Sequence, residues 1–248
     1  MTLPLIVTFA NQPYLPILLN WLRAPGLVDL MPQVRVVALD SETRDALPVE
    51  HVIYRPTDIS DFSGLMVLRV RVLRELLATT SSLIHSDADA VWLQNPLPAI
   101  EACAADLCFS QGTVHPPDVH ARHGVVVCSG FFSARNTPAM QHFLAAFEER
   151  VESEGSDQTS VNRLLDAHGV QWQIDDPYII PFRGKRFTAS PHVIRAADHL
   201  PMSVAILPHH QFSRRMETLD PEVIVAHPNA PKTCTAKIEV LSRLGLWF

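Results

Sequence analysis

The sequence predicts an α/β fold, a single domain whose central sheet is mixed, mostly parallel and flanked by helices. Short apolar, β-branched runs alternate with segments of helical period through the first half of the 248 residues. No repeat, low-complexity tract or linker interrupts this order. Polar residues also follow several of the expected strands, and ligands bind beyond the carboxyl ends of strands in sheets of this kind.

The first half supplies the alternating elements. Apolar and β-branched runs predict strands at 3–10, 34–40, 51–56, 81–89 and 106–111. Apolar residues at helical spacing predict helices at 14–24 and 64–80, and Pro16 is compatible with the first turn of the earlier one. This order of strands and helices is the one that favours parallel pairing.

The second half contains more varied elements. A strand is expected at 123–135, passing through a bend at Gly130, and helices are expected at 137–153 and 156–169. Ser156 has the position of an N-cap, and Gly169 follows the end of the second helix. Short strands are expected at 171–176, 178–182 and 204–208, and a strand-like VIVA at 223–226 precedes a helix-like segment.

Composition and charge exclude several classes of protein. The net charge of −6 argues against nucleic acid as a partner, because phosphate binding favours a basic face. No stretch has the roughly 18 apolar residues that a membrane span needs, and the N-terminus lacks the pattern of a signal peptide. The four cysteines show no CxxC spacing, which predicts reduced thiols and a cytoplasmic location.

Two carboxylates one residue apart, Asp87 and Asp89, follow the apolar run at 81–86. In an extended strand their side chains share one face, and two like charges so close favour a bound cation. Apolar residues on both sides indicate burial, which makes unpaired carboxylates costly. The alternative is an ordinary turn, in which the carboxylates accept hydrogen bonds from backbone amides.

A histidine and two lysines lie far downstream. His227 follows the strand-like VIVA, and Lys232 and Lys237 come next. One histidine with two carboxylates suits Mn²⁺ better than Ca²⁺, and lysines nearby neutralise phosphate oxygens. The alternative is a hydrogen-bonded loop histidine and two solvated lysines.

Four segments, in this order, resemble the nucleotide-diphospho-sugar transferase family: SDADAVWLQNPLP, SGFFSARNTP, SDQTSVNRLL and AHPNAPK…AKIEVLSRLGLW. Together with the opening VTFANQPYL, the resemblance covers nearly the whole chain. It implies a single Rossmann-like domain of the GT-A type over residues 1–248, with a nucleotide-binding half to about residue 110 and a half for the sugar and acceptor from about 111. It also implies a metal-dependent glycosyltransferase, of hexosyl or pentosyl type, that retains configuration.

The resemblance implies a donor site around the metal. Asp87, Asp89 and His227 would hold Mn²⁺ or Mg²⁺, with Asp87 and Ala88 beside the donor. Either Lys232 or Lys237 would meet the diphosphate, because the segment PNAPK after His227 departs from the spacing of related enzymes. The other donor contacts that it implies are Thr8, Ala10, Asn11 and Asp40 for uridine or another nucleoside, and Arg69 or Arg71 for the diphosphate.

The sugar and the acceptor would meet two further segments. Gly130 and Phe131 would contact the transferred sugar, and Asp157 with Gln158 would face the sugar and a hydroxyl acceptor, either a glycan or a small molecule. Each has an alternative role: Gly130 as a strand bend, Phe131 in the core and Asp157 as a helix cap. If the reaction inverted configuration, Asp157 would be the candidate general base.

Two other classes of function use similar residues. A metal-dependent phosphatase or nucleotidyltransferase is one alternative, but the first strand ends in TFAN, without a nucleophilic carboxylate, and no Gly-rich basic loop follows it. A binding module for nucleotide sugars, without catalysis, is the other. Turnover together with metal-dependent binding of a nucleoside diphosphate distinguishes the enzyme from the module.

Overall fold

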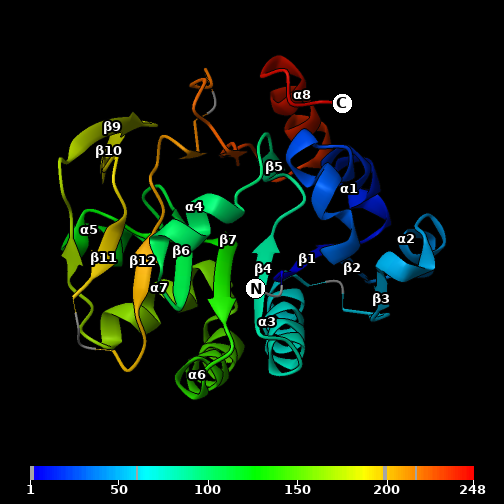
Figure 1. Ribbon diagram of the computed structural model, residues 1–248, viewed down its shortest axis with the longest axis horizontal. Coiled ribbons are helices and arrows are strands. Elements are labelled where there is room, and N and C mark those ends of the chain that lie inside the picture. Colours follow the sequence, from blue (N-terminus) through cyan, green and yellow to red (C-terminus); the bar gives the residue numbers. More distant parts are fainter. Residues whose placement is uncertain (1–2, 60, 198–199, 216) are drawn as a thin grey trace.

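A central sheet of nine strands organises the chain (Figure 1) in a computed structural model that describes residues 3–59, 61–197, 200–215 and 217–248. In spatial order the sheet consists of β3 (Val52–Tyr54), β2 (Val34–Ala38), β1 (Leu5–Ala10), β4 (Ser82–Ser86), β7 (Val127–Arg135), β6 (Leu107–Gln111), β12 (Val204–Ile206), β11 (Ile194–Ala196) and β8 (Trp172–Gln173).

The strands of the first half pair in parallel, as the alternation predicts. β1 pairs in parallel with β2 and β4, and β2 pairs in parallel with β3. β7 is antiparallel to both β4 and β6, while β12 returns to a parallel pairing with β6. The sheet is therefore mixed and mostly parallel, and the expected fold class is confirmed. The carboxyl ends of β1, β2 and β4 meet at one edge.

Two apolar layers cover the sheet. Neighbouring residues of β1, Ile6 and Val7, are fully buried and belong to opposite layers, as the period of a strand requires. One layer holds α1 (Leu15–Leu22), α4 (Leu97–Cys103) and α8 (Cys234–Arg243). The other holds α3 (Phe62–Ala78), α6 (Pro138–Glu154) and α7 (Asp157–Ala167), with α3 and α6 side by side below the sheet in Figure 1.

Polar side chains cap the N-termini of several of these helices. Ser156 accepts a hydrogen bond from Thr159 N at the start of α7, as its sequence position predicts. Thr137 and Thr233 do the same for α6 and α8, and Asp61 accepts from Gly64 N at the start of α3. Gly169, just after α7, has φ +73°, a left-handed conformation that glycine adopts without strain.

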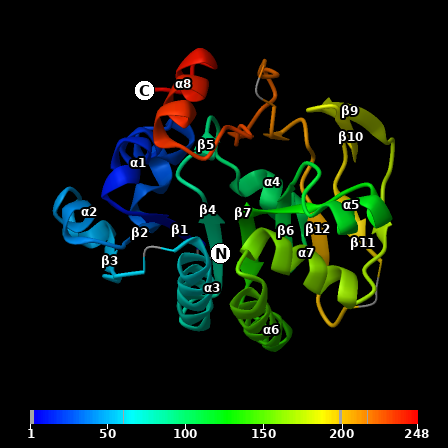
Figure 2. The same cartoon turned by 180° about the vertical axis from the view of Figure 1, so that it is seen from behind.

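Two small sheets lie beyond the carboxyl edge. β9 (Tyr178–Phe182) and β10 (Lys185–Ala189) form an antiparallel hairpin at the end of the molecule opposite β3 (Figure 2). The other small sheet joins β13 (Phe212–Ser213), β14 (Val225–Ala226) and β5 (Val91–Trp92). The latter connects segments that are far apart in the sequence.

Several expectations about element boundaries are wrong. The strand expected at 81–89 ends at Ser86, and the strands expected at 51–56, 171–176 and 204–208 are shorter, because β pairing ends before their apolar runs do. The sequence reading missed short elements, which too few residues specify: α2 (Ser41–Asp45), α5 (Pro117–His123), β5, β10, β11, β13, α4, and the 3₁₀ segments 12–14, 25–33 and 49–51.

All four cysteines, each of them a described residue, are free. Within the described ranges, no helix combines the length and apolar character that crossing a bilayer requires.

Candidate active site

Asp87 and Asp89 lie in a tight turn at the carboxyl end of β4, so the expected extended strand at these residues is wrong. Asp87 N donates to Gly130 O at 2.7 Å, and Ala90 N donates back to Asp87 O at 2.9 Å. The turn nevertheless directs both carboxylates to one place. Asp89 is 3% exposed, which makes its charge dependent on partners inside the protein.

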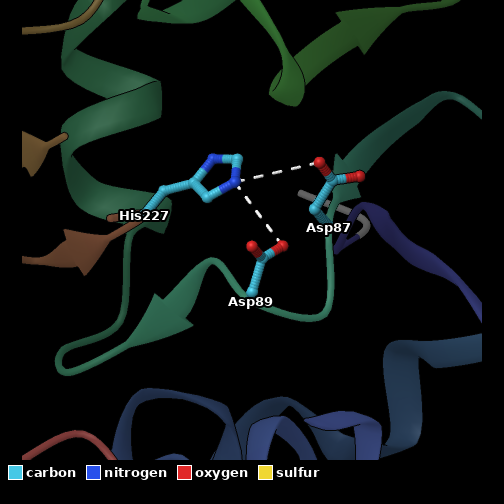
Figure 3. A group of neighbouring side chains, drawn as sticks. All are labelled: Asp87, Asp89 and His227. Carbon is cyan, nitrogen blue, oxygen red and sulfur yellow. Dashed lines mark ion pairs between the residues drawn. The ribbon is translucent and has the colours of Figure 1, made fainter. Parts of the chain in front are cut away.

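His227 reaches the two aspartates through the small sheet. β14 pairs antiparallel with β5, with Ala226 opposite Val91, so the residue after β14 lies beside the turn. His227 Nε2 is 3.8 Å from Asp87 Oδ2 and 3.6 Å from Asp89 Oδ1 (Figure 3). The pairing of two-residue strands thus assembles the three side chains that the sequence reading grouped.

Each of the two carboxylates has a different cationic partner. Arg69 Nη1 donates to Asp87 Oδ1 at 2.9 Å, and Lys237 forms an ion pair with Asp89 Oδ2. The second oxygen of each carboxylate faces His227. The two negative charges can therefore lie close together without leaving the site strongly anionic.

These partners change how the acids titrate. Burial alone would raise the pKa of Asp89, but His227 and Lys237 lower it to about 2. Burial also opposes the charged form of Asp87, yet Arg69, His85 and His227 hold its pKa well below the usual range. Burial would lower the pKa of Lys237, whereas Asp89 and Tyr14 raise it above its usual value. All three groups are charged at neutral pH.

The donor set fits a divalent cation. One oxygen from each aspartate and one nitrogen of His227 lie within 4.8 Å of one another. Two carboxylate oxygens and one imidazole nitrogen match the ligands of Mn²⁺, and Mg²⁺ accepts the oxygens. Asp87, Asp89 and His227 are therefore the residues that would hold such an ion.

Gly130 has no side chain, and this leaves room for the triad. A Cβ atom built on Gly130 would collide with Asp87 Oδ2 and would lie 2.6 Å from His227 Cε1. The pairing of β7 with β6 is also irregular here, with a register shift between Phe109 and Ser110. The glycine of the predicted bend thus lies against the triad, and any side chain there would displace it.

Two residues at the start of α7 contact the site: Asp157 through Arg69, and Gln158 through the backbone of β7. Asp157 is 4% exposed and forms an ion pair with Arg69, so Arg69 connects Asp157 to Asp87. Gln158 Oε1 accepts from Ser129 N at 2.9 Å, and its Nε2 donates to Val127 O at 2.7 Å. Asp157 therefore shares the positive charge of Arg69 with Asp87, and Gln158 holds the segment that leads to Gly130 through its hydrogen bonds.

The two lysines and the two arginines that the sequence left as alternatives lie in different surroundings. Lys237 lies at the triad, whereas Lys232 lies 4.7 Å above the ring of Phe62. Arg69 faces the aspartates, whereas Arg71 pairs with Glu148 and Glu152 on α6. Lys232 and Arg71 are thus not brought into the cluster.

The residues expected around the nucleoside lie at the ends of β1 and β2. Thr8 is fully buried, and its Oγ1 has no hydrogen-bond partner among the described residues. Ala10 is buried as well, and Asn11 follows it at the edge. The Asp40 carboxylate accepts hydrogen bonds from Thr43 N at 2.8 Å and from Gln12 N at 2.6 Å. It therefore caps the N-terminus of α2 and also holds the backbone just after Asn11.

Two expected sugar contacts lie in the interior. The ring of Phe131 is fully buried, 5.9 Å from Trp92 and 5.4 Å from Phe212 between ring centroids. Its side chain belongs to the core, so any contact of Phe131 with a sugar would have to involve its backbone. Ala88, between the two aspartates, is 3% exposed.

The sequence reading missed Arg214 and Cys128. Arg214 Nη1 lies 2.5 Å from His227 Nδ1 and 3.4 Å from Cys128 Sγ. Burial alone would raise the pKa of Cys128, but Arg214 and His227 lower it to about 6, so a thiolate balances the arginine at neutral pH. The pair Arg214-Arg215 after a short apolar run was the available signal, but no spacing linked it to His227.

The chain matches a known family in sequence. The sequence model of the family described as nucleotide-diphospho-sugar transferase matches residues 29–241. The chain is 23% identical over 186 residues to the beta-arabinofuranosyltransferase RAY1 of Arabidopsis thaliana, a match that covers 69% of this chain and 34% of that protein. The matched region thus corresponds to about a third of the length of that relative.

A solved structure has a similar fold. The galactosyltransferase LgtC, crystallised with donor and acceptor sugar analogues, superposes with a TM-score of 0.53 at 13% identity. The match covers 98% of this chain and 95% of that one. At this identity the likeness establishes the fold alone, and that fold is the one the sequence resemblance implies.

Proposed function

The chain belongs to the nucleotide-diphospho-sugar transferase family, and from this premise we propose that it is a metal-dependent glycosyltransferase. It transfers a sugar from a nucleoside-diphosphate sugar, with UDP as the proposed nucleotide, to a hydroxyl group of a glycan or small molecule. The observation that carries the proposal is the triad of Asp87, Asp89 and His227, whose ligand atoms lie within 4.8 Å of one another.

The triad and its cations suit a diphosphate. A divalent ion held by these three residues, Mn²⁺ or Mg²⁺, supplies Lewis-acid stabilisation to a departing diphosphate. Lys237 and Arg69 are already fixed by Asp89 and Asp87, so they offer preorganised positive charge at the same place. Such charge stabilises the negative charge that develops as the anomeric C–O bond breaks.

The two halves of the chain take different substrates in this proposal. The nucleoside lies against Thr8, Ala10, Asn11 and Asp40, at the carboxyl edge formed by the first 110 residues or so. The sugar and acceptor lie toward Gly130, Phe131 and the second half. The two relatives named above transfer a pentose and a hexose by their names, so both kinds of donor sugar belong in the first screen.

Retention of configuration is the proposed stereochemistry. The acceptor oxygen forms the new bond to the anomeric carbon, the bond to the diphosphate breaks with its electron pair, and the acceptor proton passes to a diphosphate oxygen. The ion pair of Asp157 with Arg69 supports this course, because a carboxylate held by a guanidinium is a poor general base. An inverted anomeric centre in the product, seen by NMR, would refute retention.

A cytoplasmic location remains part of the proposal. The free state of Cys103, Cys108, Cys128 and Cys234 is what a reducing compartment favours. Localisation of the tagged chain by microscopy or fractionation in its own cells tests this point.

The deciding experiment is a titration of UDP into the protein by calorimetry, with Mn²⁺ or with EDTA. We expect binding only with Mn²⁺, and loss of that binding in Asp89→Ala. Asp45→Ala removes an exposed carboxylate at the end of α2 and is the matched control. Binding that persists in EDTA and in Asp89→Ala would contradict a metal-dependent donor site.

Two further outcomes identify the other functional classes. Metal-dependent binding without turnover on any donor and acceptor would favour a binding module. Hydrolysis of simple phosphate esters would favour a phosphatase, and release of diphosphate from a nucleoside triphosphate would favour a nucleotidyltransferase.

A further inference from the structure

A pocket of about 340 Å³ lies on the side of the triad away from β1–β3, and Arg214 lies between the pocket and His227. The β9–β10 hairpin forms one wall, and the other contains His209, Arg214, Arg215, Glu217 and Thr218. Both figures show this hairpin and β1–β3 at opposite ends of the molecule, with β4 and β7 between them (Figures 1 and 2). The pocket is thus separate from the edge where the nucleoside residues lie.

Two arginines connect the pocket to the site. Arg214 lines the pocket, and its Nη1 lies 2.5 Å from His227 Nδ1. Arg183 also lines it, and its Nη2 donates to Asn229 O at 3.1 Å, two residues after His227. A molecule in the pocket would therefore be separated from His227 by the side chain of Arg214.

The pocket wall contains buried polar groups that lack partners. His209 is 1% exposed, and neither of its ring nitrogens has a hydrogen-bond partner among the described residues. Arg214 Nε is also buried and has no hydrogen-bond partner among the described residues. Buried polar groups are nearly always hydrogen-bonded in folded proteins, so such groups on a pocket wall are typical of a site where a ligand supplies the bond.

The charge of the pocket favours an anion. Arg183, Arg214 and Arg215 line it, and they face the carboxylate of Glu217 and the Cys128 thiolate beside Arg214. One positive charge is left over in a chain whose net charge is −6. Over the described residues, the guanidinium of Arg215 makes no hydrogen bond or ion pair. Burial and the nearby arginines lower the pKa of His209 to about 3, so the imidazole is neutral and adds hydrogen bonds without charge.

Apart from Arg183, the wall that the β9–β10 hairpin forms is apolar. Phe187 is 3% exposed and Ile180 is 8% exposed, and both line the pocket with Phe182. The ring of Phe187 lies edge-on to His209, with 5.4 Å between the centroids. This wall suits the flat or apolar body of a small organic molecule.

Resting on the transferase function above, we propose that this pocket binds the acceptor, and that the acceptor carries a carboxylate or phosphate group. Arg214 and Arg215 hold the anionic group, and Phe187 packs against the apolar body. The hydroxyl group that receives the sugar then points past Arg214 toward the triad. Carboxylate and phosphate are the two groups that a pair of guanidinium groups recognises best.

The test uses the full chain saturated with UDP and Mn²⁺, so that the donor site is occupied. The probes are 4-hydroxybenzoate and phenyl phosphate, each titrated beside a neutral twin, 4-hydroxybenzamide and phenyl dimethyl phosphate. We expect at least one charged probe to bind about tenfold more tightly than its twin, which also identifies the preferred anion. Equal affinity of both charged probes and their twins, or no binding of either charged probe at millimolar concentration, would overturn the proposal.

Variants locate the effect in the pocket. Arg215→Gln should remove the advantage of the charged probe, and Glu217→Gln should strengthen it. Arg186→Gln lies on the same hairpin but does not line the pocket, and it should leave the advantage unchanged. Opposite effects of the first two variants cannot come from misfolding, whereas two variants without effect would contradict the proposal.

Distance to the triad is the last measurement. Bound Mn²⁺ is paramagnetic, so it should broaden the proton NMR lines of a pocket-bound probe relative to Mg²⁺. Sharp lines with Mn²⁺, or displacement of the probe by UDP, would overturn the placement of the acceptor. The UDP titration itself reports on the transferase proposal alone, so a failure of the acceptor site can be distinguished from a failure of the transferase function.

Discussion

At the residue scale, the site depends on how each aspartate divides its two oxygens. One oxygen of Asp87 meets Arg69 and one of Asp89 meets Lys237, while the remaining two face His227. The cations hold the carboxylates in place and charged before any ligand arrives. Preorganisation of this kind reduces the reorganisation needed when charge develops during a reaction.

Gly130→Ala tests the space around the triad. The added Cβ would push Asp87 and His227 apart, so we expect the affinity for Mn²⁺, measured by electron paramagnetic resonance, to fall about tenfold or more. Ser133→Ala changes another buried residue of the same strand and should retain the affinity. Equal affinity in Gly130→Ala and the wild type would show that the triad does not need a glycine here.

His209 makes stability depend on pH in a defined direction. Its pKa in the folded protein is about 3, below the ordinary 6.5, so between these values the unfolded chain binds a proton that the folded chain does not. Stability is therefore complete above pH 6.5 and falls as the pH falls toward 3. We expect the wild type to lose about 1 to 2 kcal/mol more than His209→Gln between pH 7 and pH 5.

Urea unfolding at the two pH values measures this loss. His168→Gln, at an exposed histidine, is the matched control and should follow the wild type. Parallel pH profiles of the wild type and His209→Gln would contradict the assignment of a neutral, buried imidazole to this position.

At the scale of elements, the helical period of α3 directs two arginines to different sides of the helix. Arg69 and Arg71 are two residues apart, about 200° around the helix, so one faces the aspartates and the other faces α6. Arg69→Gln would leave Asp157 buried without its ion pair. We expect a loss of about 3 kcal/mol or more in unfolding free energy and weaker UDP binding.

Arg71→Gln is the matched comparison. The Arg71 side chain is 46% exposed, so its ion pairs contribute about 1 kcal/mol or less, and UDP binding should persist. Urea unfolding and UDP calorimetry on both variants separate the two roles. Equal losses of UDP affinity would mean that the helix does not divide them.

The elements also show which features a sequence can predict. The sequence contains enough periodic apolar residues to predict α3, α6, α7 and the strands of the first half. The N-cap predicted at Ser156 also forms, because its hydroxyl accepts a hydrogen bond from Thr159 N. Two-residue strands such as β5 and β14 have no period, since their pairing depends on the rest of the fold. For that reason the triad was predicted from residue types and a family resemblance, while Arg214 and Cys128 were missed.

At the scale of the whole molecule, a ligand at the triad should stabilise the fold by linkage. UDP with Mn²⁺ at about 100 times its Kd adds roughly 2.7 kcal/mol, which raises the Tm of a chain of this size by about 5 to 10 °C. Differential scanning calorimetry measures the shift. Asp89→Ala should show none, and an equal shift in that variant would place the ligand elsewhere.

Assembly of the site from distant segments has a consequence for synthesis of the chain. Lys237 follows Asp89 by 148 residues, so a ribosome adding about 5 to 20 residues per second leaves Asp89 without its lysine for roughly 7 to 30 s. His227 precedes Lys237 by only ten residues, so for almost all of that interval the nascent carboxylate lacks both partners. The site matures last, so a nascent chain truncated within that span would display the aspartate pair without being able to hold a donor.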